Sequence, residues 1–186
     1  MRLTSLTTAV FMALGAPVLA APLGDDGLHK PTWLQDTFKD MTEDLETANA
    51  EGKRLLVIFE QRGCIYCKKM HEEVFPDPEI EALIEDNYFV VQMNLFGDVE
   101  VTDFDGTALS EKEMARRWGI MFTPTMMFMP DAMPESGTAA QAAVVTMPGA
   151  FGKGTTQSLL TWVLEKGYDT DEHFQKYLAR KLAETQ

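Results

Sequence analysis

The stretch LLVIFEQRGCIYCKKM, residues 55–70, places a short apolar run directly before two cysteines that are separated by two residues. The run from Leu55 to Phe59 is apolar and partly β-branched, which predicts a buried strand. The residues after the second cysteine are good helix formers. Cys64 and Cys67 are therefore expected on a strand-to-helix turn, and the chain contains no other cysteine.

The position of the two cysteines favours redox chemistry. At the beginning of a helix, free backbone N–H groups and the positive end of the helix dipole favour a thiolate, which would activate Cys64. Cys67 lies one turn inside the helix, close enough to form a disulfide with Cys64. We therefore expect Cys64 to be the nucleophile and Cys67 to be its sheltered partner.

A structural disulfide and a metal site are the alternative roles for the pair. In the loop-entropy model, a disulfide that closes so small a ring stabilises the folded state by about 2 kcal/mol, against roughly 3 kcal/mol for a fifteen-residue loop. A stabilising disulfide would therefore be expected to span more chain. A metal site could add His71, four residues after Cys67 on the same helical face. Closed zinc sites usually take four ligands from two separated pairs, and the sequence has no second CxxC or His pair. We therefore expect neither a metal ion nor another cofactor.

The first twenty residues have the features of a secretory signal peptide. Arg2 is followed by an apolar run without acidic residues and then by the small-residue segment 16–20, and the apolar run is too short to span a bilayer. Cleavage is expected after Ala20, because cleavage after Ala21 would place Pro22 next to the scissile bond. An uncleaved anchor is the alternative.

The expected mature chain is a single acidic domain. Removal of residues 1–20 changes the formal net charge from −13 to −14, so nucleic acid and anionic membrane surfaces are not expected partners. An N-terminal segment is expected over residues 21–35, with His29 as a solvated side chain, and the domain itself over residues 36–186. Two cysteines in one CxxC of an exported domain predict work in an oxidising compartment, the periplasm.

The rest of the chain predicts alternating helices and strands. Apolar residues at three- and four-residue intervals predict a core-packing helix that ends at Gly52. These residues are Trp33, Leu34, Phe38, Met41, Leu45 and Ala48. A further helix is expected from Pro78, with Asp77 as its N-cap, to Asn87, followed by a strand over residues 88–95.

A hairpin and a short helix are expected next. Asp105-Gly106 lies between two short β-like runs, which predicts a tight turn within residues 101–109. The acidic residues around this turn miss the EF-hand spacing, so a solvated acidic hairpin is expected instead of a calcium site. They are Asp98, Glu100, Asp103 and Asp105. Ser110 and Glu113 form a capping box that opens a helix closing at Gly119.

Pro124 directly precedes an apolar strand expected at residues 126–129. A proline cannot donate to a β-ladder and belongs at a strand entrance, and the Thr123–Pro124 bond is expected to be cis. The continuous apolar run predicts a central, buried strand, and Trp118 and Trp162 are expected in the core. After this strand the pattern predicts one more strand, at residues 142–147, and two helices, at residues 155–166 and 171–183.

This order of elements resembles the thioredoxin fold over most of residues 36–167. Three segments carry the resemblance: FEQRGCIYCKKM (59–70), RRWGIMFTPTMMFM (116–129) and MPGAFGKGTTQSLLTWV (147–163). Within this superfamily the chain looks most like the periplasmic SoxW type. It is also similar to the C-terminal domain of the membrane reductant transporter DsbD, through its CxxCK and the turn at residues 75–78. The VTDFDG segment (101–106) and the extra length before Pro124 fit the SoxW type better than a minimal thioredoxin.

The resemblance implies an α/β protein with the thioredoxin fold: a central mixed β-sheet flanked by helices, with an inserted hairpin and an extra C-terminal helix. It also implies a thiol-disulfide reductant of exported protein disulfides. Cys64 would attack the substrate disulfide and Cys67 would release the product. Thr123 and Pro124 would pair with the extended substrate chain, and Tyr66 and Met121 would belong to an apolar docking rim. A membrane thiol transporter of the CcdA or DsbD type is the implied electron donor.

The sequence departs from the family pattern at two places. Thioredoxin and the DsbD domain carry a buried Asp six residues before the first cysteine, where this chain has Ile58, and Glu60 is the nearest acid. The dipeptide between the cysteines lacks the His that makes DsbA a strong oxidant, which favours reduction. An oxidant or isomerase of DsbA or DsbC character, and a non-catalytic module that binds clients or a metal ion, are the alternative functions.

Overall fold

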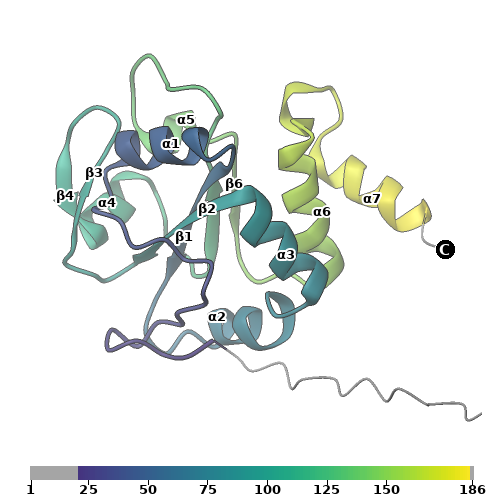
Figure 1. The fold of residues 1–186 in the computed structure, drawn as a ribbon, viewed down its shortest axis with the longest axis horizontal. Helices are drawn as coiled ribbons and strands as arrows, with labels where there is room; N and C mark the ends of the chain where they lie inside the picture. The colour runs from purple at the N-terminus through teal and green to yellow at the C-terminus, as the bar shows by residue number, and fades with distance from the viewer. Residues whose placement is uncertain (1–20, 185–186) are drawn as a thin grey trace, which may run out of the picture.

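The computed structural model describes residues 21–184, in which a four-stranded mixed sheet lies between two layers of helices (Figure 1). The sheet has the order β2-β1-β5-β6. Its strands are β1 (Arg54–Glu60), β2 (Tyr88–Asn94), β5 (Thr125–Phe128) and β6 (Val145–Pro148). β1 and β2 run parallel, whereas β5 is antiparallel to both β1 and β6. The predicted signal peptide, residues 1–20, lies outside the described residues.

The helices surround this sheet. They are α1 (Met41–Ala50), α2 (Ile65–Lys69), α3 (Pro78–Asn87), α4 (Glu111–Arg117), α5 (Ala139–Ala142), α6 (Lys153–Leu164) and α7 (Phe174–Glu184). α2 continues directly into the π-helix η1 (Met70–Val74), and the 3₁₀ helix η2 (Gly167–Asp169) joins α6 to α7. A separate hairpin consists of β3 (Glu100–Thr102) and β4 (Ala108–Ser110). Among the described residues, no helix has both the length and the apolar character needed to cross a membrane.

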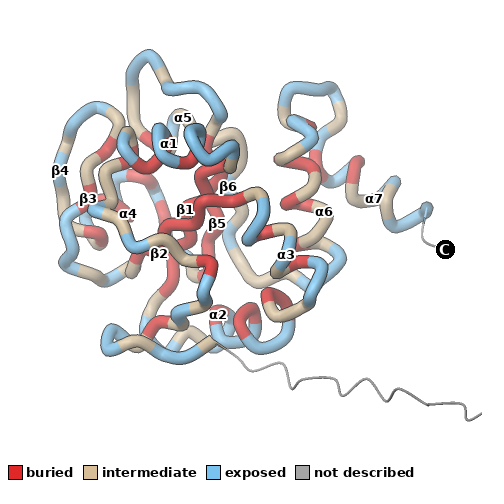
Figure 2. The backbone as a smooth tube through the Cα atoms, viewed as in Figure 1, coloured by how far each residue is buried: buried red, intermediate tan, exposed pale blue. Residues whose placement is uncertain are grey.

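Two hydrophobic cores form because successive side chains of a strand point to opposite faces of the sheet. All seven residues of β1 are buried. Leu56 and Ile58 belong to the core under η1, α3, α6 and α7, whereas Leu55, Val57 and Phe59 belong to the core under α1, α4 and α5. Figure 2 shows the buried backbone concentrated in the strands and in the inner faces of the helices. β1 is therefore the strand on which both layers pack.

Most of the expected elements are confirmed. Asp77 caps α3 with Pro78 at its first position, the inserted hairpin forms, and Glu113 accepts from both the hydroxyl and the backbone N–H of Ser110. β5 lies inside the sheet, and Trp118 and Trp162 are buried. The extra C-terminal helix is α7. The predicted fold class, a thioredoxin-like mixed sheet flanked by helices, is confirmed.

The first helix begins later than its apolar periodicity predicts. α1 begins at Met41, because Asp40 caps it by accepting from the backbone N–H groups of Thr42 and Glu43. Lys39 has a φ of 57°, which is incompatible with a right-handed helix. Phe38 is consequently 92% exposed and is not the core residue that the periodicity predicts.

The segment before the last strand also differs from its prediction. Residues 139–142 form the helix α5, and β6 begins only at Val145. Thr138 caps this helix by accepting from the Gln141 backbone N–H, and the Gln141 side chain accepts from the Thr138 backbone in return. A capping box ahead of alanines favours helix over strand.

Asp103 is buried, which corrects the expectation of a fully solvated acidic hairpin. Its carboxylate accepts from Trp118 Nε1 at 2.7 Å, from the Ala139 backbone N–H at 2.7 Å and from the Phe104 backbone N–H at 2.8 Å. Arg117 adds an ion pair at 3.2 Å. Asp103 therefore ties the hairpin to both α4 and α5.

We expect Asp103→Ala to lower the free energy of unfolding by about 3 kcal/mol, because it leaves the buried N–H groups of Trp118 and Ala139 without an acceptor. Asp98, on the same insertion, is a matched control: its side chain is 81% exposed and forms an ion pair with Lys112. Asp98→Ala should cost less than about 0.5 kcal/mol. Urea unfolding of both variants checks this, and equal losses would contradict the anchoring role.

Asp44 gives the fold a dependence on pH. Its side chain lies in α1 with only 4% exposure, and burial raises the pKa of its carboxyl to about 6. In the unfolded chain this carboxyl ionises near pH 4. The contribution of Asp44 to the free energy of unfolding therefore falls as the pH rises from about 4 to about 6, and it stays low above about pH 6.

Asp44→Asn should remove this loss and make the protein more stable than the wild type at pH 7 by up to about 2 kcal/mol, with no gain at pH 4. Glu46→Gln, at an exposed position of the same helix, should change neither value. Thermal unfolding at both pH values measures the difference. A variant that is less stable than the wild type at pH 7 would contradict the cost of the buried charge.

Candidate functional site

Cys64 and Cys67 form a disulfide at the beginning of α2, with their Cα atoms 5.2 Å apart. Cys64 is the N-cap of α2, and its Sγ accepts the backbone N–H of Cys67 at 3.0 Å. Cys64 is half-buried, whereas Cys67 is only 2% exposed. The predicted division between an accessible first cysteine and a sheltered second one therefore matches the geometry.

The loop before β5 lies directly against Cys64. The Thr123–Pro124 peptide bond is cis, as expected from its position. The carbonyl oxygen of Thr123 lies 3.5 Å from Cys64 Sγ, and the Thr123 hydroxyl donates to the same sulfur at 3.4 Å. Pro124 is buried. The structure thus brings together Cys64, Cys67, Thr123 and Pro124.

Exposed apolar side chains surround the disulfide. Ile65 and Tyr66, between the two cysteines, and Met121 and Phe122, before Thr123, all expose more than half of their surface. Tyr66 and Met121 are the residues expected on a docking rim. Ile65 and Phe122 extend the same apolar surface.

The N-terminal segment lies on the other side of the disulfide. Leu23 and His29 form an isolated bridge, and Leu28 is buried. Arg62, just before the cysteines, donates to the backbone carbonyls of residues 25 and 26. A cavity of about 370 Å³ lies between this segment and the CxxC, and its lining includes Cys64, Cys67, Glu60 and His29.

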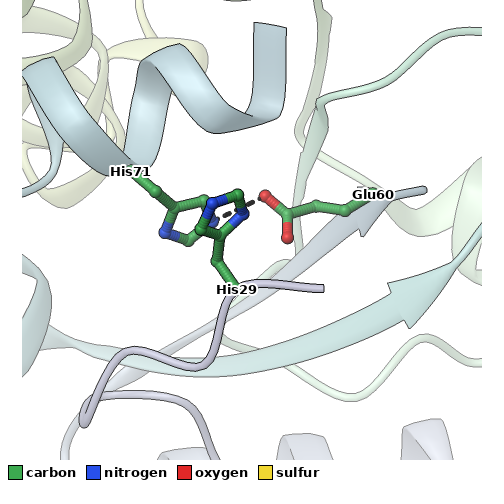
Figure 3. A group of neighbouring side chains, drawn as sticks. All are labelled: His29, Glu60 and His71. Atoms are coloured by element: carbon green, nitrogen blue, oxygen red, sulfur yellow. Dashed lines mark hydrogen bonds and ion pairs between the residues drawn. The ribbon is translucent and has the colours of Figure 1, made fainter. Parts of the chain in front are cut away.

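A buried polar cluster adjoins this cavity (Figure 3). Glu60, at the end of β1, accepts a hydrogen bond across 2.7 Å from Nε2 of His71, in η1. His29 stacks on the His71 ring and is half-buried, which corrects the expectation that it is simply solvated. Burial, with a smaller effect from the charge of His71, lowers the pKa of His29. Ile58, where the family pattern has an Asp, packs into the hydrophobic core.

The donor atoms of His29, Glu60 and His71 lie within 4.8 Å of one another, so these three residues could hold a metal ion. The present geometry is that of a hydrogen-bonded stack instead. The His29 and His71 rings are nearly parallel, at 13°, with centroids 4.5 Å apart. A ring nitrogen binds a metal ion along its lone pair, which lies in the plane of the ring. Because the two rings are stacked in nearly parallel planes, one ion can bind both only if one ring turns.

A model of the thioredoxin-like domain family matches residues 41–136, which is more than half of the chain. The chain therefore belongs to the thioredoxin-like domain family. The family and the redox-type cysteine pair together make the protein a thiol-disulfide oxidoreductase. No curated protein matches the sequence.

Two solved structures with TM-scores of 0.50 and 0.53 have the same fold. A thioredoxin from Thermus thermophilus is 26% identical, covering 69% of this chain and 86% of its own, with a TM-score of 0.53. A thioredoxin-fold protein from Helicobacter pylori is 19% identical, covering 78% of this chain and 92% of its own, with a TM-score of 0.50. The oxidised DsbD C-terminal domain from Neisseria meningitidis is 12% identical, covers 67% of this chain and 90% of its own, and has a TM-score of 0.43.

The reduced protein should be alkylated at Cys64 at least ~10-fold faster than at Cys67, because reactivity follows thiolate character and access, and Cys67 is buried. Brief treatment with iodoacetamide and fragment mass spectrometry locate the modified sulfur. The control is the same reaction in guanidinium chloride, where the two rates should agree within ~3-fold. Equal labelling of the folded protein would contradict the assigned order of the cysteines.

Proposed function

We propose that this oxidoreductase acts in a periplasm as a reductant of disulfides in exported proteins. The observation that carries the proposal is the asymmetric pair at the beginning of α2, with Cys64 half-buried beside an apolar rim and Cys67 enclosed. An accessible sulfur can attack a partner protein. An enclosed sulfur can complete the exchange without meeting solvent oxidants.

The proposed reaction has two steps. The Cys64 thiolate attacks one sulfur of the substrate disulfide, which forms a mixed disulfide and releases the other substrate sulfur as a thiolate. The Cys67 thiolate then attacks Cys64, which forms the Cys64–Cys67 disulfide and releases the second substrate sulfur. The substrate gains two electrons and the protein pair loses them. The hydrogen bond from the Cys67 N–H to Cys64 Sγ supports the first step, because it stabilises negative charge on this sulfur.

The loop of Thr123 and Pro124 is proposed to orient the substrate. Its backbone lies beside Cys64 at the entrance of β5, where an extended substrate segment can pair with it as an added strand. Tyr66 is proposed to contribute apolar contact next to the reacting sulfur. Met121 suits varied substrates, because its flexible thioether adapts to different surfaces.

The compartment and the direction of electron flow rest on the sequence. The signal-like features of residues 1–20 support export, with residues 21–35 as an N-terminal segment and residues 36–186 as the thioredoxin-like domain. The SoxW-type resemblance and the absence of a His between the cysteines support reduction. An exported reductant needs a source of electrons, for which we propose a membrane thiol transporter of the CcdA or DsbD type.

Cys67→Ser should trap the substrates. With the second cysteine removed, the mixed disulfide at Cys64 cannot resolve, so covalent adducts should accumulate in periplasmic extract and disappear on treatment with dithiothreitol. Cys64→Ser is the control and should give at least ~10-fold fewer adducts, because it lacks the accessible nucleophile. Non-reducing electrophoresis followed by mass spectrometry identifies the partners.

Two results would contradict the proposal. The absence of dithiothreitol-sensitive adducts with Cys67→Ser would argue against disulfide exchange and for a non-catalytic module. A reduction potential of the pair well above that of thioredoxin, about −270 mV, would instead indicate an oxidant or isomerase. Equilibration with glutathione buffers measures this potential.

A further inference from the structure

Glu60 and His71 form a buried pair that the exchange steps above do not use. Each is only 1% exposed. His71 Nε2 and Glu60 Oε1 are 2.7 Å apart, and the other carboxylate oxygen accepts from Gln92 Nε2 at 2.6 Å. Burial of such groups is costly unless they are paired, and these two are paired with each other. The Glu60 side chain points from the end of β1 toward the His71 ring, which comes from η1 (Figure 3).

Aromatic rings hold the His71 side chain in place. His29 stacks on it with centroids 4.5 Å apart, Trp33 lies nearly parallel at 6.2 Å, and Phe75 makes an edge contact at 5.1 Å. A ring enclosed in this way keeps Nε2 directed at Glu60. The hydrogen bond to Glu60 then assigns the proton of a neutral His71 to Nε2 and leaves Nδ1 as an acceptor. Nδ1 is buried and has no hydrogen-bond partner.

Cys67 lies one helical turn before His71. Residues four apart lie close to the same face of an α-helix, and although His71 is already in the π-helix η1, its side chain and that of Cys67 lie on the same side of the continuous helical segment. Both residues are buried. Cys67 and Glu60 also line the same cavity of about 370 Å³. Burial disfavours a thiolate at Cys67, yet the second exchange step needs one.

We propose that His71 is the general base for Cys67 and that Glu60 is its positioning residue. This inference rests on the proposed exchange reaction. The Cys67 thiol gives its proton to Nδ1 of His71, and the Glu60 carboxylate stabilises the imidazolium that forms. The Cys67 thiolate attacks Cys64 of the mixed disulfide, the bond between Cys64 and the substrate breaks, and the substrate sulfur leaves with the electron pair. The proton then passes from His71 Nε2 to the Glu60 carboxylate, which lines the cavity, and from there to water.

Other titratable and charged groups lie around this cluster. They are His29 and Lys30 from the N-terminal segment, Lys68 from α2 and Glu72 from η1. His29 has its pKa lowered by burial, so it stays neutral at pH 7 and can stack on a charged His71 without strong repulsion. Lys30 donates to Gln92 at 2.6 Å, and Gln92 in turn donates to Glu60. Within the pair, His71 keeps one buried nitrogen, Nδ1, that has no hydrogen-bond partner among the described residues.

The two exchange steps can be timed separately with the aromatic disulfide DTNB. The reduced protein releases one thionitrobenzoate when Cys64 attacks and a second when Cys67 resolves the mixed disulfide, and stopped-flow absorbance records both. In His71→Gln the second release should be at least ~10-fold slower at pH 6.5, as for the loss of a general base. The first release should stay within ~2-fold. The gap should narrow as the pH rises toward about 9, because more of the Cys67 thiol then ionises without a base.

Two further variants make the result specific. Glu60→Gln keeps the shape of the side chain and should slow the second release in the same pH-dependent way, but less than His71→Gln. His173→Gln changes an exposed histidine just before α7 and should leave both releases unchanged. Near-ultraviolet circular dichroism confirms that each variant is folded.

Several outcomes would overturn the inference. One is a second release by His71→Gln at the wild-type rate across pH 6–9, and another is an equal slowing of both releases in this variant. A third is the loss of the second release from the wild-type protein after treatment with EDTA, which would assign the cluster to a metal ion. A wild-type protein that never gives the second release would overturn the exchange reaction itself, so the two failures are distinguishable.

Discussion

The pairing of β1 with strands on both sides is the constraint on which the rest of the structure depends. β1 is parallel to β2 and antiparallel to β5, and the register sets Phe59 opposite Thr125. Because β5 begins where β1 ends, the loop of Thr123 and Pro124 must lie at the same end of the sheet as the CxxC turn. The contact between Thr123 and Cys64, which are 59 residues apart in sequence, is therefore a consequence of strand register.

The same end of the sheet collects buried polar groups in an otherwise apolar strand. Glu60 is the last residue of β1, and β2 supplies Gln92 beside it. Burial removes Glu60 and Gln92 from water, which costs free energy. Their hydrogen bonds to each other and to His71 offset this cost. Ile58 shows the contrast: it lies two residues earlier and packs entirely among apolar side chains. The buried acid of this strand is therefore Glu60, at the strand end, and not residue 58, where the family pattern has an Asp. Glu60 lines the same cavity as Cys67.

Sequence patterns were sufficient where the determining interactions are local. The strand before Cys64, the cap of α3 by Asp77 and the hairpin depend on neighbouring residues, and each is confirmed. The beginning of α1 was predicted wrongly, because periodicity extends back to Trp33 whereas the left-handed backbone of Lys39 interrupts the helix. The sequence predicts a solvated Asp103, but its partners Trp118 and Ala139 come from distant elements. Long-range partners leave no local pattern.

The site follows the same division. Spacing alone identifies Cys64 and Cys67, and the i, i+4 relation identifies His71 as a neighbour of Cys67, but nothing local connects His29 to either. His29 reaches the site because the N-terminal segment folds back, with Leu28 buried and Arg62 donating to its backbone carbonyls. That segment lies outside residues 41–136, the part of the chain that matches the thioredoxin-like family. The cysteines therefore come from the shared domain, whereas part of the enclosure of His71 comes from a segment that the family match does not include. The environment of the second cysteine can differ from that in a relative even where the CxxC is the same.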